Sequence, residues 1–151
     1  MTAYHPAAQS LQGLLTVSME IELRLSQRLG LNLTDYRAVS TLSQAPPVTV
    51  GQLADALGTT PATTTAIVNR LEKGGFVARH RDDSDRRHVR VSVTAEGYQR
   101  IMALMRPLLT ATNDHLWSLD ADRQAAIADF LDVTRGQMHD HLLELSGEDP
   151  R

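Results

Sequence analysis

The sequence predicts a mainly α protein with a winged helix-turn-helix core, an α/β wing hairpin and long helices at both ends. Two short capped helices between Val48 and Lys73 are joined by a tight turn at Gly58. Two strands separated by a polar tip follow them, between Phe76 and Val93. Longer segments with apolar residues at helical spacing lie on both sides of this core. Two short helices followed by a strand pair predict a helix-turn-helix with a wing.

The first helix of the core has a complete capping pattern. Thr49 and Gln52 form a T-x-x-Q capping box, in which each side chain satisfies a backbone amide of the first turn. Leu53 and Ala54 then lie on one face of the helix. Gly58 supplies the left-handed residue that ends the helix.

The second helix of the core begins and ends just as clearly. Thr60 is its expected cap, and Pro61 occupies its first position, where the missing N–H is not needed. Gly74 and Gly75 end it. The residues expected to face inward are Ala62, Ala66, Ile67 and Leu71. The outward face then carries threonines, whose hydroxyls can bond phosphates or bases and whose methyls can contact thymine.

The wing is predicted from strand propensity and charge. Phe76 to Arg81 suits a strand, and Val89 to Val93 alternates with period two, so its valines can share a buried face. The segment between them, Asp82 to Arg87, contains no apolar residue. From Arg70 to Arg90 the local charge is +3, although the whole chain carries −3. A basic patch on an acidic body suits a protein that contacts phosphates with one face.

The segments on both sides of the core read as helices with apolar stripes. Residues 7 to 29 are expected to form one helix that stops at Gly30, and a shorter helix is expected from a cap at Thr34 to before Pro46. After the wing, Thr94 caps a long helix in which Pro107 should cause a kink. A last helix begins near Asp120. We expect the core to close without these stripes, which favours their pairing with a second copy of the chain.

Composition sets limits on the function. The chain of 151 residues has no cysteine, which excludes disulfides and thiol-based sensing. It has no apolar run long enough for a membrane span and no secretory signal at its start, so we expect a cytoplasmic protein without a membrane partner.

An enzyme is not expected, and neither is a cofactor. The sequence has no Ser-His-Asp spacing, no glycine-rich phosphate loop and no cysteine nucleophile. Of the six histidines, His139 and His141 are two residues apart and would point in different directions on a helix, so no metal site is expected. A metal site formed between two subunits, or a winged helix that binds another protein, remains an alternative.

The segment from Arg70 to Gly97, RLEKGGFVARHRDDSDRRHVRVSVTAEG, resembles a signature of the MarR family of transcriptional regulators. The resemblance covers nearly the whole chain. It implies one domain over residues 1–151, with a DNA-binding lobe at 34–93 and dimerisation helices at 1–33 and 94–151. It also implies a homodimer that binds a pseudo-palindromic operator, and a repressor that a small-molecule effector releases.

The candidate DNA-binding residues come from both lines of reasoning. The resemblance implies that the helix from Thr60 to Lys73 enters the major groove and that the wing reaches the minor groove through Arg86, oriented by Asp85. The outward face of the helix is expected to present hydroxyls, with Thr63 and Thr64 the most available. The full candidate set is Thr59, Thr60, Pro61, Thr63, Thr64, Asn69, Arg70, Arg81, Asp85, Arg86 and Arg87.

The effector site is less defined by the sequence. The resemblance places an aromatic acid or other apolar anion between the dimerisation helices and the DNA-binding lobe. Tyr36, Arg37, His115 and Trp117 could line such a pocket. Each of these residues is equally well explained as part of the core or of the surface, so no role is assigned to them.

Overall fold

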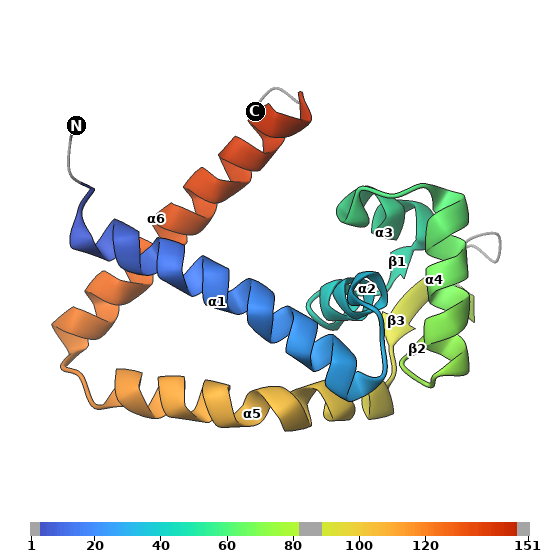
Figure 1. Cartoon of the computed structure of the whole chain (residues 1–151), viewed down its shortest axis with the longest axis horizontal. Helices are drawn as coiled ribbons and strands as arrows, with labels where there is room; N and C mark the ends of the chain where they lie inside the picture. Colours follow the sequence, from blue (N-terminus) through green and yellow to red (C-terminus); the bar gives the residue numbers. More distant parts are fainter. Residues whose placement is uncertain (1–3, 82–88, 148–151) are drawn as a thin grey trace. The chain divides into compact units, whose positions relative to one another are not determined.

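The computed structural model describes residues 4–81 and 89–147, which form two compact units (Figure 1). The N-terminal unit spans Met1–Met105, and the C-terminal unit spans Arg106–Arg151. The mainly helical winged fold predicted from the sequence is confirmed. No helix in the described parts of the chain is long and apolar enough to cross a membrane.

Helices α1 and α2 open the N-terminal unit. α1 (Pro6–Leu29) ends at Gly30, whose φ of 70° is left-handed as expected. α2 (Leu33–Ser43) has Asn32 as its cap, because the Asn32 side chain accepts a hydrogen bond from the Asp35 amide at 2.8 Å. The expected cap at Thr34 is therefore wrong, since the cap lies two residues earlier.

The helix-turn-helix is formed by α3 (Val50–Leu57) and α4 (Pro61–Lys73). Both halves of the Thr49–Gln52 capping box are present, at 2.9 and 3.2 Å. Gly58 has φ 61° and ends α3, and Thr60 caps α4 through the Thr63 amide. These local predictions are confirmed.

The wing belongs to a three-stranded antiparallel sheet rather than to an isolated strand pair. Its strands β1 (Val48–Thr49), β2 (Val77–Arg81) and β3 (Val89–Val93) lie in the order β1-β3-β2. β1 cannot be predicted from the sequence pattern, because two residues are too few to show an alternation. β3 places only Val91 fully inside, whereas Val89 is 40% exposed. The expected tip of the wing lies outside the described residues.

The hydrophobic core sits between α2, α3, α4 and the sheet, and both terminal regions contribute to it. Leu25 and Leu29 come from α1, and Ile101 comes from α5 (Ala95–Trp117). The expectation that the winged region closes its core without the flanking helices is therefore wrong. The last turns of α1 are part of the core, whereas its earlier turns leave several apolar side chains exposed: Leu14, Leu15, Val17, Met19 and Leu23.

A group of close contacts connects the end of α4 with the start of α5. The carbonyl of Phe76 accepts a bond from the Thr94 amide at 2.9 Å, and the Thr94 hydroxyl donates to the Gly75 carbonyl at 2.7 Å. The same hydroxyl accepts from the Gly97 amide at 2.9 Å, so Thr94 caps α5 as predicted. The Arg100 guanidinium covers the Phe76 ring, 4.0 Å from its centre. Gly97 is buried directly against the Phe76 backbone.

The C-terminal unit contains the rest of α5 and α6 (Ala121–Ser146), which begins where expected and has Asp120 as its cap. α6 exposes a series of large apolar side chains: Phe130, Leu131, Val133, Met138, Leu142 and Leu145. Pro107 lies inside α5, directly after the division between the units. The kink expected at Pro107 stays a prediction.

Gly97→Ala should destabilise the fold by about 1–3 kcal/mol, because an added methyl must displace backbone. A Cβ at this position would lie 2.4 Å from the Phe76 carbonyl oxygen and 2.8 Å from its Cα. The matched control is Gly51→Ala in α3, where the nearest atom would be 3.8 Å away. Gly51 lies in the first turn of α3, so the control should change the stability by no more than about 0.5 kcal/mol. Urea unfolding of both variants checks this, and equal effects would contradict the steric argument.

Candidate nucleic-acid interface

Helix α4 has an inner face and an outer face, and their boundary differs from the expected one. The fully buried positions are Thr64, Ile67, Val68 and Leu71, which follow the spacing of a single helix face. The exposed positions include Ala62, Thr63, Thr65, Ala66 and Asn69. The expectation that Ala62 and Ala66 face inward is wrong. We call the exposed set Ala62, Thr63, Thr65, Ala66 and Asn69 the outer face of α4.

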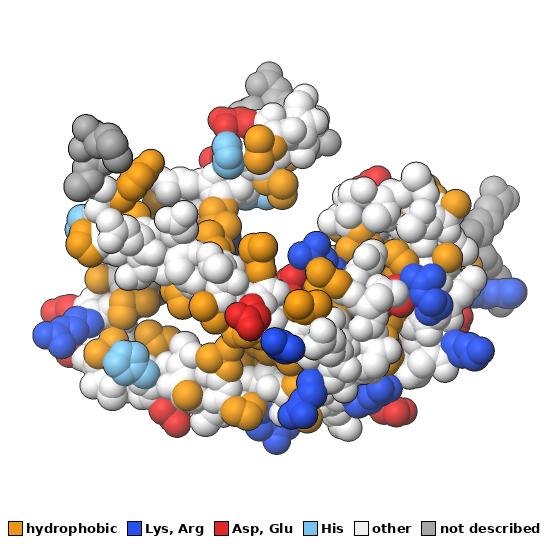
Figure 2. Space-filling view, in the orientation of Figure 1, with side chains coloured by type: hydrophobic (Ala, Val, Ile, Leu, Met, Phe, Trp, Pro, Cys, Tyr) orange, Lys and Arg blue, Asp and Glu red, His pale blue; other side chains and the backbone are white. Residues whose placement is uncertain are grey.

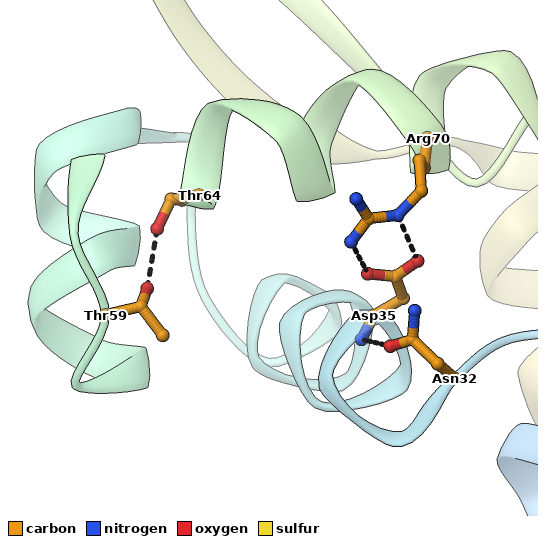
Figure 3. A network of polar contacts seen from close by, with 5 residues as sticks. All are labelled: Asn32, Asp35, Thr59, Thr64 and Arg70. Carbon is orange, nitrogen blue, oxygen red and sulfur yellow. Dashed lines mark hydrogen bonds and ion pairs between the residues drawn. The ribbon is translucent and has the colours of Figure 1, made fainter. Parts of the chain in front are cut away.

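Thr64 is buried because its hydroxyl has an internal partner. Its Oγ1 lies 2.7 Å from Oγ1 of Thr59, which precedes α4 in the turn (Figure 3). The side chain has no exposed surface, so the expectation that Thr64 is available to a ligand is wrong. A hydrogen-bonded hydroxyl can be buried at little cost, and its methyl group packs with the core.

The remaining threonines of the turn and helix are accessible to different degrees. Thr60 and Thr63 are exposed, and their hydroxyl oxygens lie 2.9 Å apart at the start of α4. Pro61 is exposed beside them. Thr65, which the sequence analysis missed, is also exposed and donates its hydroxyl to the Pro61 carbonyl at 2.8 Å. The signal that could have found Thr65 is its spacing of four residues from Asn69, which the sequence already placed on the outward face.

Arg70 is joined to α2 by a bidentate ion pair. Its Nε and Nη2 donate to the two carboxylate oxygens of Asp35 at 2.9 and 2.6 Å (Figure 3). The Asp35 side chain is only 5% exposed, whereas that of Arg70 is 53% exposed. The hydrogen bond with the Asp35 carboxylate raises the pKa of the Arg70 guanidinium. This arrangement is the strong, directional form of an ion pair.

Other arginines of the basic segment also have partners within the N-terminal unit. Arg79 forms an ion pair with Glu72 and donates to Oδ1 of Asn69 at 2.7 Å. The amide N–H groups of Asn69 are not used in this bond and can donate to a base. Arg90 donates to the Pro47 carbonyl at 3.2 Å, and Arg81 is exposed at the end of β2. Asp85, Arg86 and Arg87 lie outside the described residues.

The residues considered for an effector pocket are distributed over the chain. Tyr36 is buried in α2, and its burial, with the nearby Glu22 carboxylate, raises its pKa. Arg37 pairs with Glu22 at 3.1 Å. Within the C-terminal unit, Trp117 is 72% exposed and His115 is exposed. Among the described residues, no group of three or more potential ligands is placed to hold a metal ion.

Helices α3 and α4 with the sheet β1–β3 define a winged helix-turn-helix protein. The MarR family model matches residues 31–89, so this part of the chain is similar to the family whose signature the segment from Arg70 to Gly97 resembles. The matched region contains α2, α3, α4 and β2.

Two similar proteins are named as transcriptional regulators. The chain is 40% identical to the HTH-type transcriptional regulator YcgE of Bacillus subtilis over 59% of this chain and 58% of YcgE. It is 28% identical to the transcriptional repressor MprA of Escherichia coli over 66% of this chain and 57% of MprA. The matches thus span somewhat more than half of these relatives. They are named as regulators rather than enzymes, in agreement with the sequence analysis.

A solved structure shows the same fold. Streptococcus pneumoniae FabT, crystallised in complex with DNA, superposes with a TM-score of 0.62 at 23% identity. The superposition covers 89% of this chain and 94% of FabT.

Thr64→Val should lower the free energy of unfolding by about 1 kcal/mol, because it keeps the shape but removes a buried hydrogen bond. The control is Thr65→Val, which makes the same chemical change on the outer face of α4 and should have an effect within about 0.5 kcal/mol. Chemical denaturation measures both. A neutral Thr64→Val would show that the contact with Thr59 contributes nothing to stability.

Proposed function

We propose that this protein is a sequence-specific, double-stranded DNA-binding transcriptional regulator that acts as a homodimer. The observation that carries the proposal is the outer face of α4. Two polar contacts, Thr64 with Thr59 and Arg70 with Asp35, hold this capped helix in the fold. Its outer face then presents a row of small, uncharged side chains to solvent. Such a helix can lie deep in the major groove of B-DNA, which is wide enough to admit it.

The chemistry of the outer face suits contact with bases and phosphates. The hydroxyls of Thr63 and Thr65 can bond either, and the methyl groups of Ala62, Thr65 and Ala66 can contact thymine. Thr59, Thr60 and Pro61 lie at the start of α4, where helix N-termini favour phosphate. Because the first turns of α4 contain no arginine, lysine or glutamine, we expect few bidentate contacts with bases.

The wing supplies the second part of the proposed interface. Arg81 is exposed at the end of β2, and the sequence continues to Arg86 and Arg87. Figure 2 shows Lys and Arg side chains over the part of the N-terminal unit that carries α4 and β2. Arginines are attracted to narrow, A·T-rich minor grooves, so DNA shape should contribute to recognition.

Dimerisation is supported by the apolar side chains of the terminal helices. α1 and α6 each expose five or more large apolar residues, which Figure 2 shows as hydrophobic areas over these helices. Patches of this kind mark surfaces that associate with another protein. A second copy of the chain would cover them with the same kind of surface and would place two α4 helices on one duplex.

Repression and its release complete the proposal. MprA is named a transcriptional repressor, and FabT is described in complex with DNA. A groove of about 370 Å³ in the N-terminal unit combines apolar Val17, Ile21, Leu25 and Leu104 with Arg24, Arg28 and Glu20, and the Glu20 carboxylate lies 3.9 Å from Arg24. An apolar anion that binds there is our proposed releasing effector. A regulator of this kind works beside the chromosome, in the cytoplasm.

Selection of bound fragments from a genomic pool by the purified protein should enrich duplexes with two inverted half-sites. Their centres should lie about one helical turn, roughly 34 Å, apart, because two-fold symmetric dimers bind in this way. A duplex that lacks one half-site serves as the control and should bind much more weakly. Enrichment of no sequence at all would contradict the proposed function, and a single asymmetric site would contradict the dimer.

Arg86→Ala should weaken binding to the selected duplex and make the dependence of log K on log salt shallower by about one unit, as expected for one lost phosphate contact. The control is Arg135→Ala, which removes the same charge from α6, where the side chain is 81% exposed. Fluorescence anisotropy over a salt series measures both. An unchanged affinity and slope for Arg86→Ala would remove the wing from the interface.

A further inference from the structure

We infer that Asp35 is a positioning residue for DNA recognition, which acts by holding Arg70 and thereby sets the orientation of α4 toward the groove. The inference rests on the proposed function. It assigns a role to a residue of α2 that lies outside the helix-turn-helix, and it gives Arg70 a role other than direct contact with DNA.

Asp35 is held firmly in place. It lies in the first turn of α2, where its amide donates to the capping side chain of Asn32 at 2.8 Å. Its neighbours Tyr36, Ala38 and Val39 are buried in the core, so α2 cannot shift easily. The carboxylate itself is almost fully buried, and Arg70 bonds both of its oxygens. A buried carboxylate needs such a partner, because an unpaired charge inside a protein is strongly unfavourable.

The ion pair supplies direction that the apolar core cannot. Ile67, Val68 and Leu71 attach α4 to the core through contacts that depend little on orientation. The guanidinium of Arg70 is planar, and its two parallel bonds to Asp35 fix both distance and angle. A rotation of α4 about its axis would break at least one of these bonds.

A second polar contact holds the other end of the helix. Thr64 bonds Thr59 near the start of α4, and Arg70 bonds Asp35 six residues later, about 9 Å along the axis (Figure 3). Two directional contacts at separate points define the rotation of a helix about its axis. The outer face of α4 is thereby aimed in one direction, and it includes Thr63, Thr65 and Asn69.

The chain offers a matched control for Arg70. Arg37 is also an arginine in an ion pair of α2, with Glu22 of α1, and its side chain is 52% exposed against 53% for Arg70. Arg37 does not contact α4 in this pair. Arg37→Gln and Arg70→Gln therefore remove the same charge from equally exposed positions, but only Arg70→Gln releases α4.

The experiment compares Asp35→Asn, Arg70→Gln, the double variant and Arg37→Gln with the wild-type chain. Fluorescence anisotropy measures the affinity for the duplex selected by the wild-type protein and for a scrambled duplex of equal composition. The ratio of the two affinities should fall about tenfold in Asp35→Asn and in Arg70→Gln, the size of a lost base contact. The double variant should be no worse than Arg70→Gln, and Arg37→Gln should keep the wild-type ratio. A role limited to stability would lower the melting temperature but leave this ratio unchanged.

Two results would overturn the inference. One is a folded Asp35→Asn variant that keeps the wild-type ratio of the two affinities. If Arg70→Gln still loses specificity in that case, Arg70 contacts DNA directly. The other is a salt slope for Arg70→Gln shallower by about one unit than that of Arg37→Gln, the mark of a lost phosphate contact. If Asp35→Asn does not fold, the inference is tested with Arg70→Gln and the double variant, through their affinity ratio and their salt slope. A wild-type chain that selects no duplex refutes the proposed function before any variant is measured.

Discussion

The close approach of Gly97 to the backbone of Phe76 is the constraint on which the winged region depends. Phe76 links the end of α4 to β2, and its carbonyl receives the amide of Thr94, which links β3 to α5. Four elements therefore meet where a Cβ at residue 97 would lie 2.4 Å from a carbonyl oxygen. This contact explains physically the order of Thr94 and Gly97 in this chain: the threonine caps α5, and the glycine leaves room for the backbone of Phe76.

Much of the fold could be predicted because its signals are local. A capping box needs only Thr49 and Gln52, and a left-handed helix end needs only Gly58, so four or fewer neighbouring residues define each. β1 and the cap at Asn32 were missed for the same reason. A two-residue strand has no period of its own, and Asn32 and Thr34 are equally good caps until the helix position is known.

The candidate site was predicted less completely, because its decisive contacts join distant residues. Arg70 and Asp35 are 35 positions apart, and nothing in the local sequence of either residue indicates the other. The faces of α4 were assigned by the polarity of single residues, which placed Ala66 inside and Thr64 outside. Burial follows the helix face instead: Thr64 lies on the face of Ile67 and Leu71, where Thr59 meets its hydroxyl, whereas Ala66 lies on the exposed face.

The separation of the two faces of α4 has an evolutionary consequence. Stability depends on the buried positions and their polar anchors, whereas the outer face of α4 contributes little to folding. Ala62 and Ala66 are exposed, so larger side chains there would extend into solvent without disturbing the core. Under the proposed function, gene duplicates of this chain could therefore acquire new operator preferences by single substitutions at these alanines, with no compensating change elsewhere in the fold.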